Sequence, residues 1–196
     1  MSGNGLRIRL ASEADYTALG LVFTEAERYH REALPHIFRA PQDQFPPRSL
    51  FRQWVSEAGS AVYVADDVGD LVGFVTVRTD SAPDRGILQP RNFAVVDTLA
   101  VRSDQRRRGV GHSLMEAVHG WARERRLGHV SLNVWEFNQP AIDFYRALGY
   151  QTVSRRMECS LPEPSAPGPS APTDMSDGPR YNRSAGTTDG SSSGHV

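Results

Sequence analysis

One stretch of the sequence changes its hydrophobic period from two to about 3.6 within a few residues, and this constrains the fold more than any other feature. Residues 91–102, RNFAVVDTLAVR, have the β-branched composition and the alternation of a strand. Residues 106–112, RRRGVGH, place three arginines against two glycines. Apolar residues follow at helical spacing, namely Val110, Leu114, Met115, Val118, Trp121 and Ala122. A strand, a glycine turn and a helix in this order indicate an α/β architecture.

The rest of the sequence alternates between strand and helix patterns. Strands are expected over residues 6–10, in a hairpin over residues 60–79 with its turn at residues 67–70, over residues 129–135, and as one strand or a pair over residues 150–161. Helices are expected from a Ser12 cap to about His30, over residues 48–58, and over residues 139–148, where Gly149 is the C-terminal cap. The hairpins make the predicted sheet partly antiparallel.

Composition excludes several classes of protein. The chain has 196 residues, 39% of them hydrophobic, and a net charge of -1, which argues against a general nucleic-acid binder. All 22 basic residues are arginine, which a GC-rich genome explains without a functional reason. No segment is typical of a signal peptide or a membrane span. The single Cys159 allows no internal disulfide and no cysteine-based zinc site. We therefore expect a soluble, cytoplasmic protein that binds no metal, nucleic acid or membrane.

Composition changes after Leu161. Residues 162–196 hold six of the 13 prolines and one aromatic residue, Tyr181. Such a segment buries too little apolar surface to offset its ordering entropy. The sequence predicts a folded domain over residues 1–161 and a disordered tail, rich in Pro, Ser and Gly, over residues 162–196.

The glycine–arginine turn has the arrangement of an anion site. The first N–H groups of a helix have no intrahelical partner and carry partial positive charge, and glycine lets a phosphate approach the backbone. A P-loop is excluded because His112 and Ser113 follow the second glycine where that motif has lysine. A Rossmann fingerprint is excluded because Leu114 stands where it has its third glycine. A solvated, arginine-rich helix cap explains the turn equally well at this point.

A second stretch, LNVWEFNQPAIDFYRALGY over residues 132–150, favours the anion site. Together the two stretches resemble the GNAT-type N-acetyltransferases. The first signature, R-x-x-G-x-G, is Arg106, Gly109 and Gly111, directly after a strand that ends in LAV. The second, N-x-x-A-x-x-F-Y-x-x-x-G-Y, is formed by Asn138, Ala141, Phe144, Tyr145, Gly149 and Tyr150. The resemblance covers about residues 6–161 and implies the GNAT fold, an α/β fold whose mixed, mostly antiparallel central sheet has splayed fourth and fifth strands and flanking helices.

The resemblance also implies acetyl-CoA as cosubstrate and an amine acceptor as second substrate. The pyrophosphate would lie at the turn, and the pantetheine arm would pair with the strand end. The implied acetyl-CoA residues are Leu99, Ala100, Val101, Arg106, Arg107, Arg108, Gly109, Val110, Gly111, His112, Asn138, Ala141 and Tyr145. The acetyl group would pass directly to the amine in a ternary complex, without an acyl-enzyme. Homodimerisation is compatible with this resemblance.

The reaction that the resemblance implies needs three chemical groups: an acid for the leaving thiolate, a base for the incoming amine and a donor to the oxyanion. Tyr145 is the candidate acid for the leaving thiolate, with Phe144 free to take the packing role. Asp97 and Glu136 are the candidate bases for the amine, and water is an alternative. Asp97 would be an ordinary solvated residue if its side of the strand faces outward. A backbone N–H near Thr98 or Leu99 could stabilise the oxyanion.

Acceptor specificity is expected from the early segment, residues 25–38. The candidates there are Glu25, Tyr29, His30, His36 and Phe38, each of which could instead be a loop or packing residue. A GNAT fold that binds acyl-CoA as a sensor or interaction module, without turnover, is the alternative function. The presence of Tyr145 favours catalysis, because a module that only binds needs no thiolate acid.

Overall fold

The structure is a computed structural model that describes residues 5–40, 46–82, 86–87 and 89–161. The chain divides into two units, Met1–Thr152 and Val153–Val196. The predicted disordered tail, residues 162–196, lies outside the described residues.

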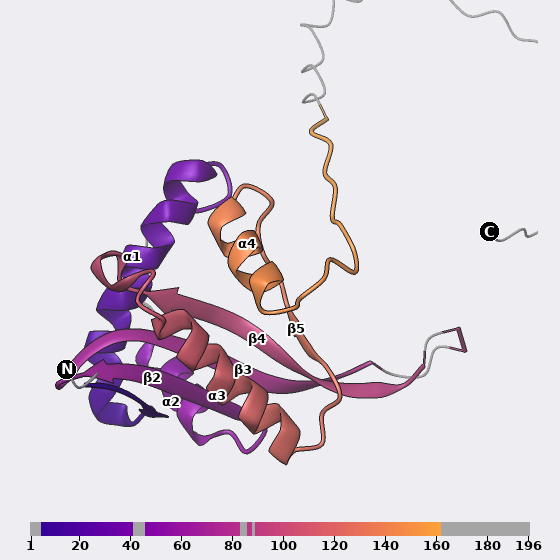
Figure 1. Ribbon diagram of the computed structural model, residues 1–196. Helices are drawn as coiled ribbons and strands as arrows, with labels where there is room; N and C mark the ends of the chain where they lie inside the picture. Colours follow the sequence, from indigo (N-terminus) through magenta and orange to yellow (C-terminus); the bar gives the residue numbers. More distant parts are fainter. Residues whose placement is uncertain (1–4, 41–45, 83–85, 88, 162–196) are drawn as a thin grey trace, which may run out of the picture. The chain divides into compact units, whose positions relative to one another are not determined.

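The described part of the first unit contains one five-stranded sheet with the strands in chain order (Figure 1). The strands are β1 (Leu6–Leu10), β2 (Ser60–Asp67), β3 (Asp70–Ala82), β4 (Arg91–Val101) and β5 (Val130–Leu132). The first four pair antiparallel, and β5 pairs parallel to β4. The predicted mixed, mostly antiparallel sheet is confirmed.

Helices cover both faces of the sheet (Figure 1). On one face, α1 (Tyr16–Ala33) and α2 (Arg48–Ser56) contribute to a core around Phe51 and Phe74. On the other face, α3 (Val110–Glu124) buries the whole predicted apolar set, from Val110 to Ala122. Side chains of α4 (Gln139–Ala147) and the residues after it pack against this second core. No helix among the described residues is both long and apolar enough to cross a membrane.

An ion pair joins the start of α1 to strand β1. Both carboxylate oxygens of Asp15 accept hydrogen bonds from the guanidinium of Arg9, at 2.7 and 2.8 Å. The backbone N–H of Ser12 donates to the same carboxylate at 2.7 Å, as in a capping box. Arg9 lies on β1 and Asp15 in the 3₁₀ turn Glu13–Asp15, so the pair fastens the strand to the helix that follows.

The end of α4 has the two hydrogen bonds of a Schellman motif. The N–H of Gly149 donates to the carbonyl of Arg146 at 2.9 Å, and that of Tyr150 donates to the carbonyl of Tyr145 at 3.0 Å. Gly149 has a φ of +87°, which L side chains rarely adopt, so the predicted glycine cap is confirmed. The motif brings Tyr150 back alongside Tyr145.

β4 and β5 separate after a short ladder. Pairing joins Ala94, Val95 and Val96 to Val130–Leu132 only, whereas β4 continues to Val101. Its pairing with β3 shifts register across Asp97 and then continues. The N–H of Arg102 donates to Val72 of β3 at 2.9 Å. Because alternate residues direct their backbone groups to opposite edges, Leu99 and Val101 direct theirs to the edge that β5 has left.

Two strand predictions need correction. The predicted strand over residues 129–135 is formed only at Val130–Leu132, because β4 turns away beyond that point. The predicted strand or strand pair over residues 150–161 is absent, since residues 151–161 are neither helix nor strand. Alternation alone does not make a strand, which also needs a backbone partner. Val153, Met157 and Leu161, its apolar residues, are more than four-fifths exposed.

Candidate active site

A cavity of about 600 Å³ opens where β4 and β5 separate. Its walls come from the end of β4, from the turn before α3, from α4 and from the second half of α1. Most of the predicted acetyl-CoA residues line it: Leu99, Ala100, Val101, Arg106, Arg107, Gly109, Gly111, His112, Asn138, Ala141 and Tyr145. The sequence signatures thus meet at one place in the fold.

The turn between β4 and α3 presents free backbone N–H groups. Gly109 is the N-cap of α3 and has a φ of +85°, with open space where a side chain would begin. The first helical hydrogen bond runs from the N–H of Ser113 to the carbonyl of Gly109, at 3.0 Å. The amides of residues 110–112 therefore precede the first bonded amide of the helix. Such amides at a helix N-terminus suit a bound phosphate.

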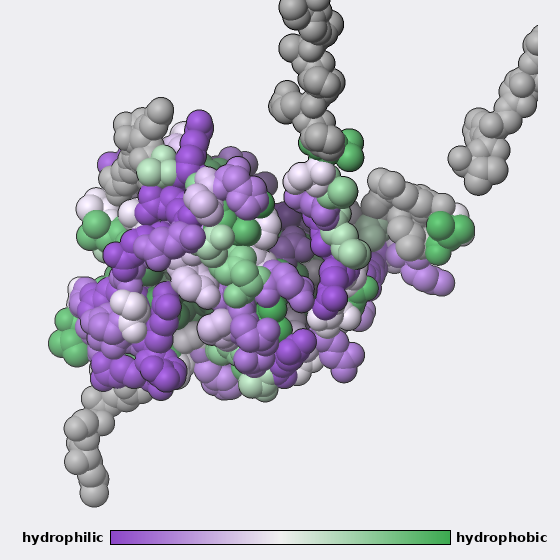
Figure 2. Space-filling model, turned by 90° about the horizontal axis from the view of Figure 1, so that it is seen from above, coloured by the Kyte–Doolittle hydropathy of each residue, from purple (hydrophilic) through white to green (hydrophobic). Residues whose placement is uncertain are grey.

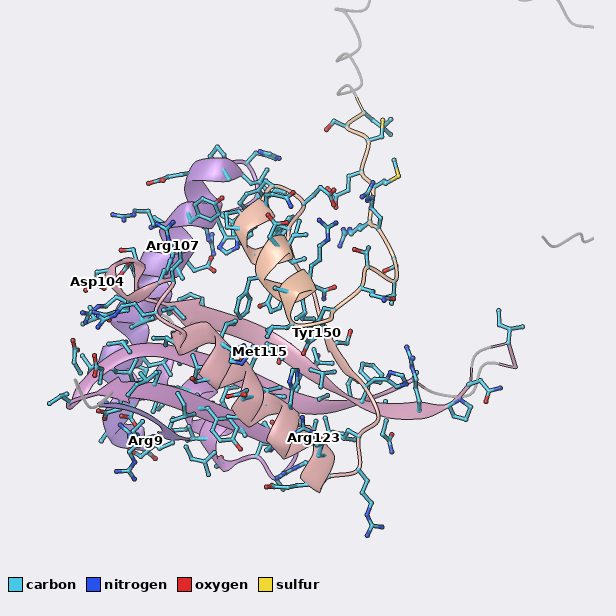
Figure 3. The ribbon with its side chains drawn as sticks, viewed as in Figure 1. Arg9, Asp104, Arg107, Met115, Arg123 and Tyr150 are labelled. Atoms are coloured by element: carbon cyan, nitrogen blue, oxygen red, sulfur yellow. The ribbon has the colours of Figure 1, made fainter. Side chains whose placement is uncertain are left out.

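The three arginines of the turn differ in position. Arg106 and Arg107 line the cavity, and Figure 3 shows Arg107 at the turn between β4 and α3. The Nε of Arg106 donates to the carbonyl of Val101 at 3.2 Å, close to the end of β4. Arg108 is exposed outside the cavity lining and donates to the side chain of Gln105 at 2.6 Å. The side chain of Val110 is buried in the core, so its predicted contact with acetyl-CoA falls to its backbone N–H.

Glu25, predicted as a substrate residue, has a different contact. Its carboxylate accepts the backbone N–H of Ser103 at 2.7 Å, which links α1 to the 3₁₀ turn Ser103–Gln105 before the arginines. Burial acts to raise the pKa of Glu25, but the hydrogen bonds from Ser103 outweigh it and the pKa is lowered. The ionised carboxylate therefore stabilises the turn. Glu25 is not one of the described residues that line the cavity.

Tyr145 projects from α4 into the cavity wall. Its ring lies between those of Phe144 and Tyr150, with centroids at 5.2 and 5.7 Å. Burial, with a smaller contribution from Tyr150, raises the pKa of Tyr145 well above the ordinary value of a tyrosine. Like any tyrosine phenol, with an ordinary pKa of about 10, that of Tyr145 is protonated at neutral pH and has a proton to donate.

The two predicted bases lie outside the lining of this cavity. Arg78 donates to both carboxylate oxygens of Asp97, at 3.0 and 3.3 Å, and both side chains are 44% exposed. Asp97 borders a smaller cavity of about 180 Å³ beside α2, together with Thr76 and Trp54. Glu136 is exposed on the segment between β5 and α4. Within the described residues, no cluster of His, Cys, Asp and Glu could hold a metal ion.

An aromatic wall closes the α1 end of the cavity. We use this name for Tyr29, His30, Phe38, Trp135 and Phe137, whose rings are linked by contacts of 5.2–5.7 Å. Tyr29 and His30, both predicted to bind the acceptor, line the cavity, and the ring of Phe38 contacts those of His30 and Trp135. Tyr29 and Trp135 remain 40% and 42% exposed, so their rings can meet a ligand. The predicted His36 is exposed and lies outside both the wall and the lining.

Sequence reasoning missed several residues of the site. Trp135 and Phe137 follow β5 directly, and the signal was the aromatic spacing in NVWEF beside the second signature. The residues that do line the cavity and were missed carry no distinctive side-chain chemistry: Ala26, Gln105, Pro140, Phe144, Ala147 and Leu148. The outer face seen in Figure 2 is mostly hydrophilic, with its hydrophobic residues scattered.

Comparison with known proteins agrees with this geometry. A family model described as the acetyltransferase (GNAT) family matches residues 24–150, more than half of the chain. The chain therefore belongs to the GNAT acetyltransferase family. The BH1408 protein of Bacillus halodurans, solved as a tetramutant, is 25% identical with a TM-score of 0.75, and the match covers 79% of this chain and 99% of that one.

Two relatives of known activity are similar over shorter stretches. Streptothricin acetyltransferase of Streptomyces lavendulae is 34% identical over 95 residues, 48% of this chain and 46% of that protein. The peptidyl-lysine N-acetyltransferase YiaC of Escherichia coli (strain K12) is 33% identical over 96 residues, 49% of this chain and 53% of that protein. The matches span about half the length of these relatives. An aminoglycoside N-acetyltransferase solved with CoA is 16% identical, has a TM-score of 0.63, and matches over 81% of this chain and 96% of its own, which shows the fold alone.

Proposed function

We propose that this protein is an N-acetyltransferase that moves the acetyl group of acetyl-CoA directly to a primary amine in a ternary complex. The observation that carries the proposal is the common cavity of the N-terminal turn of α3, the end of β4 beyond its ladder with β5, and the Tyr145 phenol. A sensor that only binds acyl-CoA would need the first two features. It would have no use for a protonated phenol at the wall.

Acetyl-CoA would supply an acetyl group already activated as a thioester. The amides of residues 110–112 would bind the pyrophosphate, with Arg107 free to reach an outer phosphate. Leu99 and Val101 would pair with the pantetheine arm as a further strand would, since their backbone groups face the vacated edge of β4. A backbone N–H at Thr98 or Leu99 would donate to the oxyanion as it forms.

Tyr145 would protonate the departing thiolate. For the incoming amine, Glu136 is the better placed of the two carboxylates, because its segment also carries Trp135 and Phe137 of the aromatic wall. Asp97 instead borders the smaller cavity beside α2. We therefore assign Glu136, acting directly or through water, as the base.

The acceptor would enter at the aromatic wall. Ring faces and the exposed edges of Tyr29 and Trp135 suit an amine with an apolar or planar body, and they attract an ammonium group through cation–π contact. Streptothricin and the lysine side chain, named by the two relatives above, are therefore the first acceptors to test.

The test combines binding with turnover. Gly109→Glu places charge and bulk at the pyrophosphate position, and Gly69→Glu is the matched control, because Gly69 has a similar φ of +89° and equally open space in the β2–β3 turn. By calorimetry, Gly109→Glu should lose at least about 100-fold in acetyl-CoA affinity, an anion-site loss of about 3 kcal/mol, while Gly69→Glu binds like the parent. Equal affinity of all three proteins would refute the site.

Turnover is measured as free-thiol release from acetyl-CoA with streptothricin, a lysine peptide, phenethylamine and sisomicin. Release that depends on an amine supports the transferase. Tight acetyl-CoA binding without release in any mixture would instead favour the binding module.

A further inference from the structure

Arg107 has a backbone conformation that is unfavourable for a residue with a side chain. Its φ is +59°, in the left-handed region, where the Cβ of an L residue lies too close to the following carbonyl oxygen. The same turn has glycine, which adopts such angles without this cost, at Gly109 with a φ of +85°. A benefit that offsets the cost of arginine at position 107 would have to come from its side chain.

The conformation alone does not mark a ligand contact, because Arg126 shares it. Arg126 follows the C-terminal cap of α3, is exposed, and has a φ of +57°. Its N–H donates to the carbonyl of Arg123 at 3.0 Å, as in other helix ends of this type. Figure 3 shows Arg107 at the start of α3 and Arg123 near its other end. Arg107 is among the described residues that line the cavity, and Arg126 is not.

The guanidinium of Arg107 is available to a ligand, unlike those of its two neighbours. The bond from Arg106 to the carbonyl of Val101 holds Arg106 at the end of β4, and Arg108 is bonded to Gln105 outside the lining. Arg107 is exposed and, within the described residues, forms no hydrogen bond or ion pair. A ligand in the cavity can therefore use this charge without breaking a contact in the protein.

The order of the site indicates which part of coenzyme A this charge would meet. The pantetheine arm is assigned above to the edge of β4, and the pyrophosphate to the amides of residues 110–112. Beyond the pyrophosphate, coenzyme A has one further charged group, the 3′-phosphate of its ribose. A phosphate monoester has a second pKa of about 6, so it is largely dianionic at neutral pH. A guanidinium can donate to two of its oxygens at once.

We propose that Arg107 binds the 3′-phosphate and lets the enzyme discriminate acetyl-CoA from 3′-dephospho-acetyl-CoA. This rests on the proposed function. The unfavourable backbone conformation is then offset by a contact that exists only when the ligand carries this phosphate. Arg107 is a specificity-determining residue, and glycine in its place should improve the turn and weaken the binding of acetyl-CoA.

The experiment is calorimetric titration of three proteins with acetyl-CoA and with 3′-dephospho-acetyl-CoA. The parent should bind acetyl-CoA about ten-fold more tightly, the low end for a charge-assisted contact, because the guanidinium is exposed. Arg107→Gly should bind both ligands equally, with the affinity that the parent has for the dephospho compound. Arg126→Gly is the matched control, since it removes the same charge at the same φ away from the cavity, and it should keep the parental ratio.

Thermal melting of the same proteins tests the side chain's role in the fold. Both glycine variants should melt no lower than the parent, because glycine accepts a positive φ without strain. A melting temperature of Arg107→Gly clearly below that of Arg126→Gly would show that the Arg107 side chain supports the fold, and it would overturn the assignment to the ligand.

The pair of ligands separates this inference from its premise. Equal parental affinity for the two would refute the contact with the 3′-phosphate and leave the proposed function intact. An equal loss for both ligands in Arg107→Gly would place the guanidinium at the pyrophosphate, which both carry, and would also refute it. A parent protein that binds neither ligand would overturn the proposed function, and the role of Arg107 with it.

Discussion

Tyr145 lies at the cavity wall, and its proposed role as the acid gives the removal of its hydroxyl a specific kinetic signature. We expect Tyr145→Phe to lower kcat roughly 10- to 100-fold, the low end for general-acid catalysis, because a thiol with a pKa of about 8.5 is already a fair leaving group. The KM for acetyl-CoA should stay constant, since phenylalanine keeps the ring contacts. Steady-state kinetics of both proteins measure this, and an unchanged kcat would reduce Tyr145 to a packing residue.

Glu136 and Asp97 can be separated by their pH dependence. An alkyl amine with a pKa of about 10.4 is almost fully charged at neutral pH and needs a base. Glu136→Gln should therefore lower kcat/KM for such an amine about 10- to 100-fold at pH 7, and less as the pH rises toward the pKa of the amine. Asp97→Asn gives the comparison. A loss in Asp97→Asn with none in Glu136→Gln would reverse the assignment.

Residues of the site that belong to a local motif could be predicted from sequence. Arg106, Gly109 and Tyr145 belong to the two signatures, each of which lies within one turn or one helix, and all three line the cavity. Contacts made across the fold could not be predicted. The bonds of Glu25 to Ser103 and of His119 to Tyr150 join residues 78 and 31 positions apart. No pattern in either segment indicates its partner.

At the scale of elements, the ion pair between β1 and the start of α1 makes the free energy of unfolding depend on pH in the acidic range. Hydrogen bonds from Arg9 first, and then those from Ser12, overcome the effect of burial and lower the pKa of Asp15 from 3.8 to about 2. Because the folded state has the lower pKa, the stabilisation is complete above about pH 4 and is lost as the pH falls toward 2. Asp15 is 8% exposed, so the contribution should be about 1–2 kcal/mol.

The measurement for this pair is the urea midpoint of the parent and of Asp15→Asn between pH 7 and pH 2. The parent should be the more stable protein at pH 7, and the difference between the two should shrink below pH 4 as the carboxyl group is protonated. A difference that stays constant with pH would show that the Arg9 contact adds nothing through charge.

Elements whose hydrophobic period and end signals lie within their own sequence could be predicted closely. The hairpin of β2 and β3, the long β4 and the apolar stripe of α3 all have the expected bounds within a few residues. The ends of the sheet could not, because a strand there depends on what lies beside it. The alternation from Val153 to Leu161 fits a strand, but no ladder of the described residues includes it.

At the scale of the whole molecule, the sequence predicts that residues 162–196 add nothing to the fold. A chain that stops at Leu161 should melt within about 1 °C of the full protein and bind acetyl-CoA equally well, because the tail lacks core residues. Differential scanning fluorimetry and calorimetry on the two proteins check this. A large fall in melting temperature would show that the tail docks on the domain.

The separation of β4 from β5 also bears on how freely this sequence can change over time. The edge that it exposes offers peptide N–H and C=O groups, which every residue except proline carries in the same form. A ligand bound there contacts main-chain groups, so its binding depends on the path of the backbone and little on which side chains the strand carries. Mutations at such positions can accumulate as long as the strand keeps its path.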